Sequence, residues 1–173
     1  MEKQKKISIL FVCMGNICRS PTAEGVVRHY LLKAGVADAF LLDSAGTLDH
    51  HVGSPPDQRT QQAALHRGYD LSALRARQVC AEDFQVFDRL LAMDLRNLAW
   101  LREHCPKTMR AKLGLFLDFA EGYEGQEVPD PYYGGSGGFE RVLDMVEAAA
   151  EGLIRAYRPW LVASGVGMAQ VAG

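Results

Sequence analysis

The chain alternates short apolar stretches with segments in which apolar residues recur at helical spacing. The apolar stretches lie at 7–13, 40–44, 87–93 and 112–116, and each is bounded by polar or turn-forming residues. Such alternation is typical of βαβ units, in which helices cover both faces of a mostly parallel sheet. The sequence therefore predicts an α/β fold with four strands.

The helical segments have recognisable start and stop signals. Ser20 and Pro21 suit the N-cap and the first helical position of a helix that ends at Gly35. The pattern predicts three further helices, at 57–67, at 95–104 and, as a long amphipathic C-terminal helix, at 139–157. We expect the glycine cluster 134–138 to be a pliable connector and residues 162–173 to be a flexible tail.

A length of 173 residues predicts a single domain, residues 1–173, large enough to fold without a metal or disulfide staple. The formal net charge of −2 gives no general attraction to nucleic acid or to an anionic membrane. The first apolar stretch is too short to span a bilayer, and Gly15, Asn16 and Arg19 interrupt it. We expect no nucleic-acid partner, no signal peptide and no membrane insertion.

Cysteine and histidine spacing gives no sign of a metal site. The cysteines at 13, 18, 80 and 105 lack paired zinc-type spacing, and no secretory signature accompanies them. Adjacent His50 and His51 cannot supply the i, i+4 geometry of a helical metal site. We predict free thiols, a reducing cytoplasmic location, and no metal or other cofactor.

The most informative segment is the loop from Cys13 to Ser20. It begins where the first strand ends and finishes at a helix N-terminus, which is where open α/β sheets bind ligands. Backbone N–H groups in such a loop converge on an anion, and the helix dipole favours negative charge there. We predict a phosphate-binding loop, with Gly15 allowing a tight turn. Its residues are Met14, Gly15, Asn16, Ile17, Cys18 and Ser20.

Two side chains of this loop have separable chemical roles. Thiols at helix N-termini or beside cations ionise readily, so Cys13 is the predicted nucleophile. The planar guanidinium of Arg19 can hold two phosphate oxygens at once and stabilise charge during phosphoryl transfer. Ser20 could donate to the sulfur, and Asn16 could hold the loop in shape. The structural alternative is a buried thiol beside a solvated arginine.

Residues 12–24, VCMGNICRSPTAE, closely resemble the signature of the low-molecular-weight protein tyrosine phosphatases. The resemblance continues over nearly the whole chain, at 44–47, 75–78, 91–94 and 129–133. It implies a small four-stranded parallel sheet flanked by helices, with no metal. It also implies hydrolysis of tyrosine-phosphorylated proteins through a cysteinyl-phosphate. For the assembly we expect a monomer or a weak dimer.

The resemblance assigns the general acid to Asp130, which lies between Pro129 and Pro131. A phenolate leaving group needs a proton, and a carboxylic acid held near the phosphate can supply it and then activate water. The prolines would stiffen the loop that presents it. Tyr132 and Tyr133 are expected to form aromatic walls of the substrate cleft, although two half-exposed surface rings are the plainer interpretation.

Three functions compete at this point. A phosphotyrosine phosphatase is favoured. Within the enzyme class, Ile17 resembles the tyrosine-selective members, whereas phosphoarginine-selective relatives carry Thr there. An arsenate reductase would need a cysteine relay, but Cys80 and Cys105 are widely separated. A catalytically silent phosphoprotein-binding module is disfavoured by the intact Cys13, Arg19 and Asp130. The resemblance further implies that Cys18 protects oxidised Cys13 as a disulfide partner.

Two positions depart from the family pattern. His50 stands where an aromatic residue, typically Trp, forms a cleft wall, so we expect a smaller, titratable wall and weaker binding of aryl substrates. Leu74 stands where a histidine normally contacts the loop asparagine. That change is expected to leave Asn16 without one hydrogen-bond partner unless another group replaces it.

Overall fold

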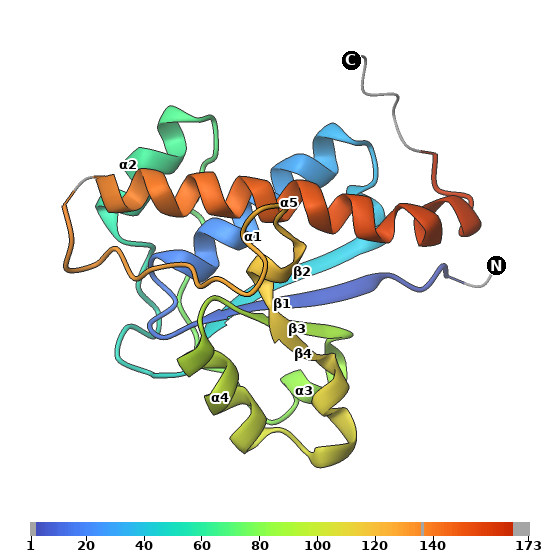
Figure 1. The fold of residues 1–173 in the computed structure, drawn as a ribbon, viewed down its shortest axis with the longest axis horizontal. Helices are drawn as coiled ribbons and strands as arrows, with labels where there is room; N and C mark the ends of the chain where they lie inside the picture. Colours follow the sequence, from blue (N-terminus) through green and yellow to red (C-terminus); the bar gives the residue numbers. More distant parts are fainter. Residues whose placement is uncertain (1–2, 136, 168–173) are drawn as a thin grey trace.

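The computed structural model describes residues 3–135 and 137–167, and it places four parallel strands in one sheet (Figure 1). The strand order is β2-β1-β3-β4, so β1 lies inside the sheet. The predicted four-stranded α/β fold is confirmed. The strands are β1 (Ile7–Cys13), β2 (Phe40–Gly46), β3 (Arg89–Ala92) and β4 (Leu113–Leu115).

Helices cover both faces of this sheet. The long helices α1 and α5 pack together on one face, and α4 lies on the other (Figure 1). No helix among the described residues is both long and apolar enough to cross a membrane. The helices are α1 (Arg19–Lys33), α2 (Gln58–His66), α3 (Asp83–Val86), α4 (Leu95–His104) and α5 (Gly137–Ala163), with short 3₁₀ turns η1 (Ala37–Ala39), η2 (Lys107–Lys112) and η3 (Phe116–Phe119).

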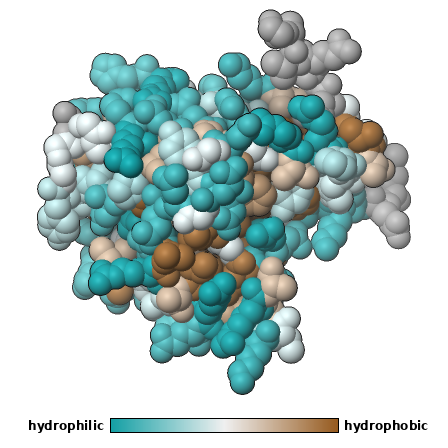
Figure 2. Space-filling model, viewed as in Figure 1, coloured by the Kyte–Doolittle hydropathy of each residue, from teal (hydrophilic) through white to brown (hydrophobic). Residues whose placement is uncertain are grey.

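Strand β1 is buried along its whole length, which explains its uninterrupted apolar sequence. Its side chains alternate between two cores: Phe11 and Cys13 face α1 and α5, whereas Leu10 and Val12 face α4. The Cys13 side chain therefore lies at the carboxyl end of β1, on the α1 side of the sheet. On the surface, Figure 2 shows mostly hydrophilic residues along α5, with hydrophobic residues gathered below it.

The sheet order creates a switch point at the end of β1. The chain leaves β1 through α1 to reach β2 on one side, and β3 pairs with β1 on the other side. In open α/β sheets, the crevice at such a point is the usual ligand site. The loop after Cys13 lies in this crevice.

Several predicted boundaries differ from the structure. Helix α1 begins at Arg19 and its N-cap is Cys18, so Ser20 is not the cap. The reason is that the Ser20 hydroxyl is engaged with the loop instead. Strand β3 is shorter than 87–93, because α3 and its C-cap Phe87 precede it.

The C-terminal helix is longer than predicted at both ends. Its first residue is Gly137, inside the expected connector, and it continues through Val162 to Ala163, inside the expected tail. Beyond it, the Val166 N–H donates to Leu161 O. Ser136 and residues 168–173 lie outside the described residues. Flexibility of the tail stays a prediction.

We predict that Gly152→Ala destabilises the protein. A Cβ atom at Gly152 would lie 1.6 Å from the carbonyl oxygen of Phe119, where α5 crosses η3. Backbone must move to relieve that overlap, and overpacking of this kind costs about 1–3 kcal/mol. The change is measured as a loss in the free energy of unfolding in urea.

Gly137→Ala in the same helix is the matched control, because nothing lies within 4 Å of a Cβ atom there. It should leave the unfolding midpoint unchanged or raise it slightly through helix propensity. Equal midpoints for the two variants would contradict the proposed close packing of α5 on η3.

Candidate active site

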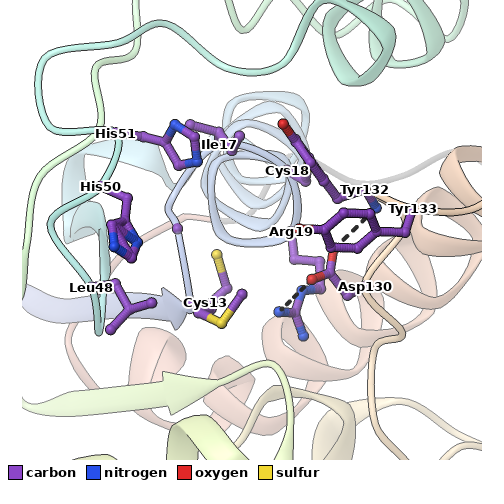
Figure 3. Close-up of a pocket in the computed structure, with 12 residues that line it drawn as sticks. Cys13, Ile17, Cys18, Arg19, Leu48, His50, His51, Asp130, Tyr132 and Tyr133 are labelled. Atoms are coloured by element: carbon purple, nitrogen blue, oxygen red, sulfur yellow. Dashed lines mark hydrogen bonds and ion pairs between the residues drawn. The ribbon is translucent and has the colours of Figure 1, made fainter.

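A pocket of about 280 Å³ opens at the carboxyl end of β1 (Figure 3). Cys13 and Arg19 lie between two walls: Leu48, His50 and His51 on one side, and the segment 130–133 on the other. Most residues that the sequence singled out are thus brought together, although their roles stay predictions. The lining residues are Cys13, Met14, Gly15, Ile17, Cys18, Arg19, Leu48, His50, His51, Asp130, Tyr132 and Tyr133.

The loop after β1 is fastened to the segment that follows β2. The N–H of Thr47 donates to Cys13 O at 2.9 Å, and the N–H of Leu48 donates to Met14 O at 3.0 Å. A Cβ atom at Gly46 would lie 2.6 Å from Met14 O, so this approach requires glycine. Asn16 has a φ of 57°, a left-handed conformation that asparagine tolerates better than most residues.

Two groups approach the Cys13 sulfur from inside the loop. The Asn16 N–H donates to Sγ at 3.3 Å, and the Ser20 hydroxyl lies 3.0 Å from Sγ. Both are buried, as is the sulfur. An anionic sulfur would accept both hydrogen bonds, so the arrangement suits a thiolate nucleophile.

The direction of the Ser20 hydrogen bond follows from Asn16. The Arg77 N–H donates to Asn16 Oδ1 at 3.0 Å, which orients the amide. Its NH₂ group then donates to Ser20 Oγ at 2.8 Å and to Ser44 Oγ at 3.0 Å. Because Ser20 Oγ accepts from Asn16, its own proton is free for the sulfur. Asn16 and Ser20 therefore support the loop from behind rather than line the pocket.

Other groups supply hydrogen-bond partners to the Asn16 amide, which is the alternative that the expectation drawn from Leu74 left open. The amide nitrogen of Asn16 donates to Ser20 Oγ and Ser44 Oγ, and the amide oxygen accepts from the Arg77 N–H. Leu74 instead packs against the main apolar core. Asn16 therefore has partners on both its amide nitrogen and its amide oxygen without a histidine at position 74.

Ser44 extends this network to Glu24, which is buried. The Ser44 hydroxyl donates to Glu24 Oε1 at 2.8 Å, and Arg28 lies 2.9 Å from the other oxygen. Burial raises the pKa of Glu24 above its usual value, although the contacts with Ser44 and Arg28 oppose that shift. The network therefore connects the loop to the interior of α1.

Arg19 is held in place before any ligand binds. Its Nη1 donates to Asp94 Oδ2 at 2.6 Å and to Val128 O at 3.2 Å, and its side chain is only 4% exposed. Burial by itself would lower the pKa of Arg19, but the charges of Cys13, Asp94 and Asp130 outweigh it and raise that pKa. The guanidinium is therefore permanently charged at the floor of the pocket.

Asp130 faces Arg19 across the pocket. Its Oδ2 lies 3.8 Å from Arg19 Nη2, and its side chain is 35% exposed (Figure 3). The Tyr132 N–H donates to Asp130 Oδ1 at 3.1 Å. The Tyr132 and Tyr133 rings meet edge to face with centroids 4.9 Å apart. An acid and two aromatic rings thus share one rim of the pocket.

The opposite rim is formed by Leu48 and two histidines. His50 is exposed and lines the pocket, and its role as a wall for the substrate stays a prediction. His51 comes from the same segment and packs over the loop, because a Cβ atom at Gly15 would lie 3.2 Å from its ring. His51 and Leu48 are wall residues that the sequence analysis missed.

Cys18 lies at the side of this pocket, buried beneath the loop. Burial raises the pKa of the Cys18 thiol to about 12, so this thiol is protonated at neutral pH. All four cysteines are free thiols in the described chain. Among the described residues, no group of three or more His, Cys, Asp or Glu side chains is arranged to hold a metal ion.

Asp94 is another residue whose role the sequence did not indicate. Its Oδ1 caps α4 by accepting the Asn97 N–H at 2.7 Å, and its Oδ2 holds Arg19. The local sequence marks it as a helix cap, since Asp is favoured there. Nothing in that local signal points to an arginine 75 positions earlier in the chain.

Comparison with known proteins points to one family. The model of the family described as low molecular weight phosphotyrosine protein phosphatase matches residues 8–159. The Bacillus subtilis low molecular weight protein-tyrosine-phosphatase YfkJ is 38% identical over 148 residues, covering 86% of this chain and 94% of that protein. The human low molecular weight phosphotyrosine protein phosphatase is 40% identical over 147 residues, covering 82% and 90% respectively.

Solved structures show the same likeness. A crystal structure of a protein tyrosine phosphatase from Entamoeba histolytica superposes with a TM-score of 0.86 at 39% identity, covering 90% of this chain and 99% of that one. The crystal structure of YfkJ gives a TM-score of 0.84 at 36% identity, with coverage of 90% and 97%.

We predict that His50→Trp lowers KM for phosphotyrosine peptides and changes kcat less. A larger apolar wall should strengthen binding of the ground state and of the transition state by similar amounts, so the gain lowers KM and leaves kcat nearly unchanged. Steady-state kinetics on the variant test this expectation.

His104→Trp is the control, because His104 lies on α4, stacked on Trp100, and does not line the pocket. It should leave KM unchanged. If His50→Trp leaves KM unchanged or raises it, position 50 is not a wall for the substrate.

Proposed function

The chain belongs to the family of low molecular weight phosphotyrosine protein phosphatases, a family of hydrolases, and we propose that it hydrolyses phosphotyrosine in proteins through a cysteinyl-phosphate on Cys13. One observation carries the proposal. Cys13, the fixed guanidinium of Arg19 and the carboxyl group of Asp130 line a single pocket at the end of β1. A nucleophile, a phosphate clamp and an acid are the groups that such a reaction needs.

In the first step, the Cys13 thiolate attacks phosphorus. The S–P bond forms as the bond between phosphorus and the tyrosine oxygen breaks, and the Asp130 carboxyl group gives its proton to that oxygen. Arg19 stabilises the charge on the equatorial phosphate oxygens, because its guanidinium is already oriented by Asp94. The backbone N–H groups of the loop supply the remaining donors.

In the second step, water attacks phosphorus and gives a proton to the Asp130 carboxylate. The S–P bond breaks, inorganic phosphate leaves, and the thiolate is restored. Ser20 supports this step, since a hydroxyl 3.0 Å from Sγ can donate to the departing sulfur. Asp130 thus serves as acid and then as base.

The depth of the nucleophile favours an aryl phosphate. Cys13 is 2% exposed, whereas Met14 and Tyr133 at the rim are 40% and 89% exposed. The substrate side chain must therefore be long enough to bring its phosphate down to Cys13. A phenyl ring can then lie between the rim that holds Tyr132 and Tyr133 and the rim that holds His50 and His51. Ile17 lines the same pocket and supports tyrosine selectivity by resemblance.

Location, assembly and cofactor use complete the proposal. We propose a cytoplasmic enzyme that acts as a monomer or a weak dimer on phosphoprotein substrates, with no metal. It should turn over a simple aryl phosphate in the presence of a chelator. Phosphate-analogue binding without turnover would instead identify a silent phosphoprotein-binding module.

We predict that Asp130→Ala acts selectively on poor leaving groups. A general acid matters most when the departing oxygen is basic, and its removal typically costs about 10²–10⁴-fold. The value of kcat/KM for phenyl phosphate should fall far more than that for p-nitrophenyl phosphate. Asp38→Ala, which changes an exposed acid in η1, should alter neither value.

Cys13→Ser should abolish turnover but still bind vanadate or phosphate, because the loop donors and Arg19 remain. Equal losses across the leaving-group series would reject Asp130 as the acid. Residual multiple turnover in Cys13→Ser would reject Cys13 as the nucleophile.

We also propose that Cys18 protects the oxidised nucleophile. Hydrogen peroxide converts the thiolate to a sulfenic acid, and the Cys18 thiol then displaces hydroxide from that sulfur, giving a Cys13–Cys18 disulfide and water. Cys18 supports this proposal by lining the same pocket. The disulfide prevents irreversible oxidation.

Peptide mapping of peroxide-inactivated enzyme should find the Cys13–Cys18 linkage, and Cys18→Ser should recover less activity on reduction than the parent. Cys105→Ser, which alters a buried thiol outside the pocket, should recover as fully as the parent. Absence of the linkage, or full recovery of Cys18→Ser, contradicts the protective role.

A further inference from the structure

The segment that carries Asp130 is fastened on both sides of the acid. Upstream, the Val128 N–H donates to Met93 O at 2.8 Å, and Val128 O accepts from Arg19. Downstream, Arg59 Nη1 donates to Tyr132 O at 3.1 Å. A carboxyl group between two fastened points has a restricted range of positions.

Arg59 is itself fixed by Asp57. Its Nε donates to Asp57 Oδ1 at 3.1 Å and its Nη2 donates to Oδ2 at 2.9 Å, which is a bidentate pair. The guanidinium also lies 5.3 Å from the ring centroid of Tyr132 and 4.9 Å from that of Phe139. The remaining guanidinium nitrogen, Nη1, is then directed at the Tyr132 carbonyl.

Asp57 in turn contacts the backbone of the phosphate-binding loop. Its N–H donates to Ile17 O at 2.8 Å, and its Oδ1 accepts the Arg59 N–H at 2.8 Å as the N-cap of α2. The hydrogen bond from Arg59 lowers the pKa of Asp57, so the pair stays ionised at neutral pH. A continuous set of contacts therefore runs from the loop through Asp57 and Arg59 to Tyr132.

Tyr132 connects this set of contacts to the acid. Its N–H donates to Asp130 Oδ1 while its carbonyl accepts from Arg59. The Arg59 side chain is 47% exposed, and exposed ion pairs contribute little to stability. We therefore expect the contacts of Arg59 to fix the position of Tyr132 and to add little to the stability of the fold.

We propose that Arg59 is a positioning residue that holds the segment of Asp130 at the distance from the phosphate-binding loop at which the acid can protonate the leaving group. The inference rests on the proposed function, because it requires Asp130 to be the acid. Arg59 does not line the catalytic pocket and touches no reacting atom. It acts through the backbone of Tyr132.

The test combines a leaving-group series with a double-mutant cycle. Arg59→Ala is expected to lower kcat/KM for phenyl phosphate by roughly tenfold to a hundredfold, as a displaced catalytic group does, and to change p-nitrophenyl phosphate little. In an Asp130→Ala background the same substitution should have no further selective effect, because the group that it positions is absent. Vanadate binding should be unchanged.

Two further variants separate positioning from charge and from folding. Arg59→Lys keeps the charge but cannot bridge Asp57 and Tyr132 O at once, so it should show a smaller loss of the same selective kind. Arg155→Ala removes an exposed arginine paired with Glu121 towards the other end of α5, and should have no effect. Melting temperatures of all variants are measured alongside.

The outcomes are distinct. A selective loss in Arg59→Ala that vanishes in the Asp130→Ala background supports the inference. An equal loss across the series, or an undiminished loss in that background, overturns it and leaves the proposed function intact. If Asp130→Ala itself shows no leaving-group selectivity, the acid assignment fails and the inference fails with it.

Discussion

The orientation of one buried amide, that of Asn16, is the constraint on which the site depends. The Arg77 N–H donates to Asn16 Oδ1, so the NH₂ group of the amide faces Ser20 and Ser44. The Ser20 proton is thereby directed at the Cys13 sulfur. The left-handed backbone of Asn16 also turns the loop so that its own N–H reaches Sγ. Loop shape and nucleophile environment thus have a common origin.

A second constraint joins elements that are distant in the chain. Arg19, at the start of α1, contacts Asp94 after β3 and the backbone of Val128 ahead of Asp130. Because the sheet order β2-β1-β3-β4 places these partners beside β1, the fold itself brings the proposed phosphate clamp, Arg19, close to the proposed acid, Asp130. The low exposure of Arg19 strengthens its ion pair with Asp94, since charges at this depth are poorly screened by solvent.

The sequence was sufficient for the fold class and for most residues of the pocket, but not for Leu48 and His51. Continuous burial of β1 and the helical spacing of α1 and α5 are local signals, so they could be read without a structure. Contacts between segments that are distant in the chain could not be predicted from such local signals. Ser20 was taken for a helix cap because its hydroxyl's partners, Asn16 and Cys13, depend on the loop's conformation. The sequence left open which groups contact Asn16 for the same reason, since a backbone donor such as the Arg77 N–H carries no sequence signal.

The proposed mechanism requires that Cys13 carries the phosphoryl group during turnover. This can be measured by rapid acid quench of enzyme turning over an aryl phosphate, followed by peptide mass spectrometry. We expect one added phosphoryl group on the peptide that contains Cys13, absent in Cys13→Ser and disappearing as substrate is exhausted. A phosphoryl group on another residue, or turnover with no phosphorylated Cys13 peptide in either the parent or Asp130→Ala, would show that Cys13 is not the nucleophile.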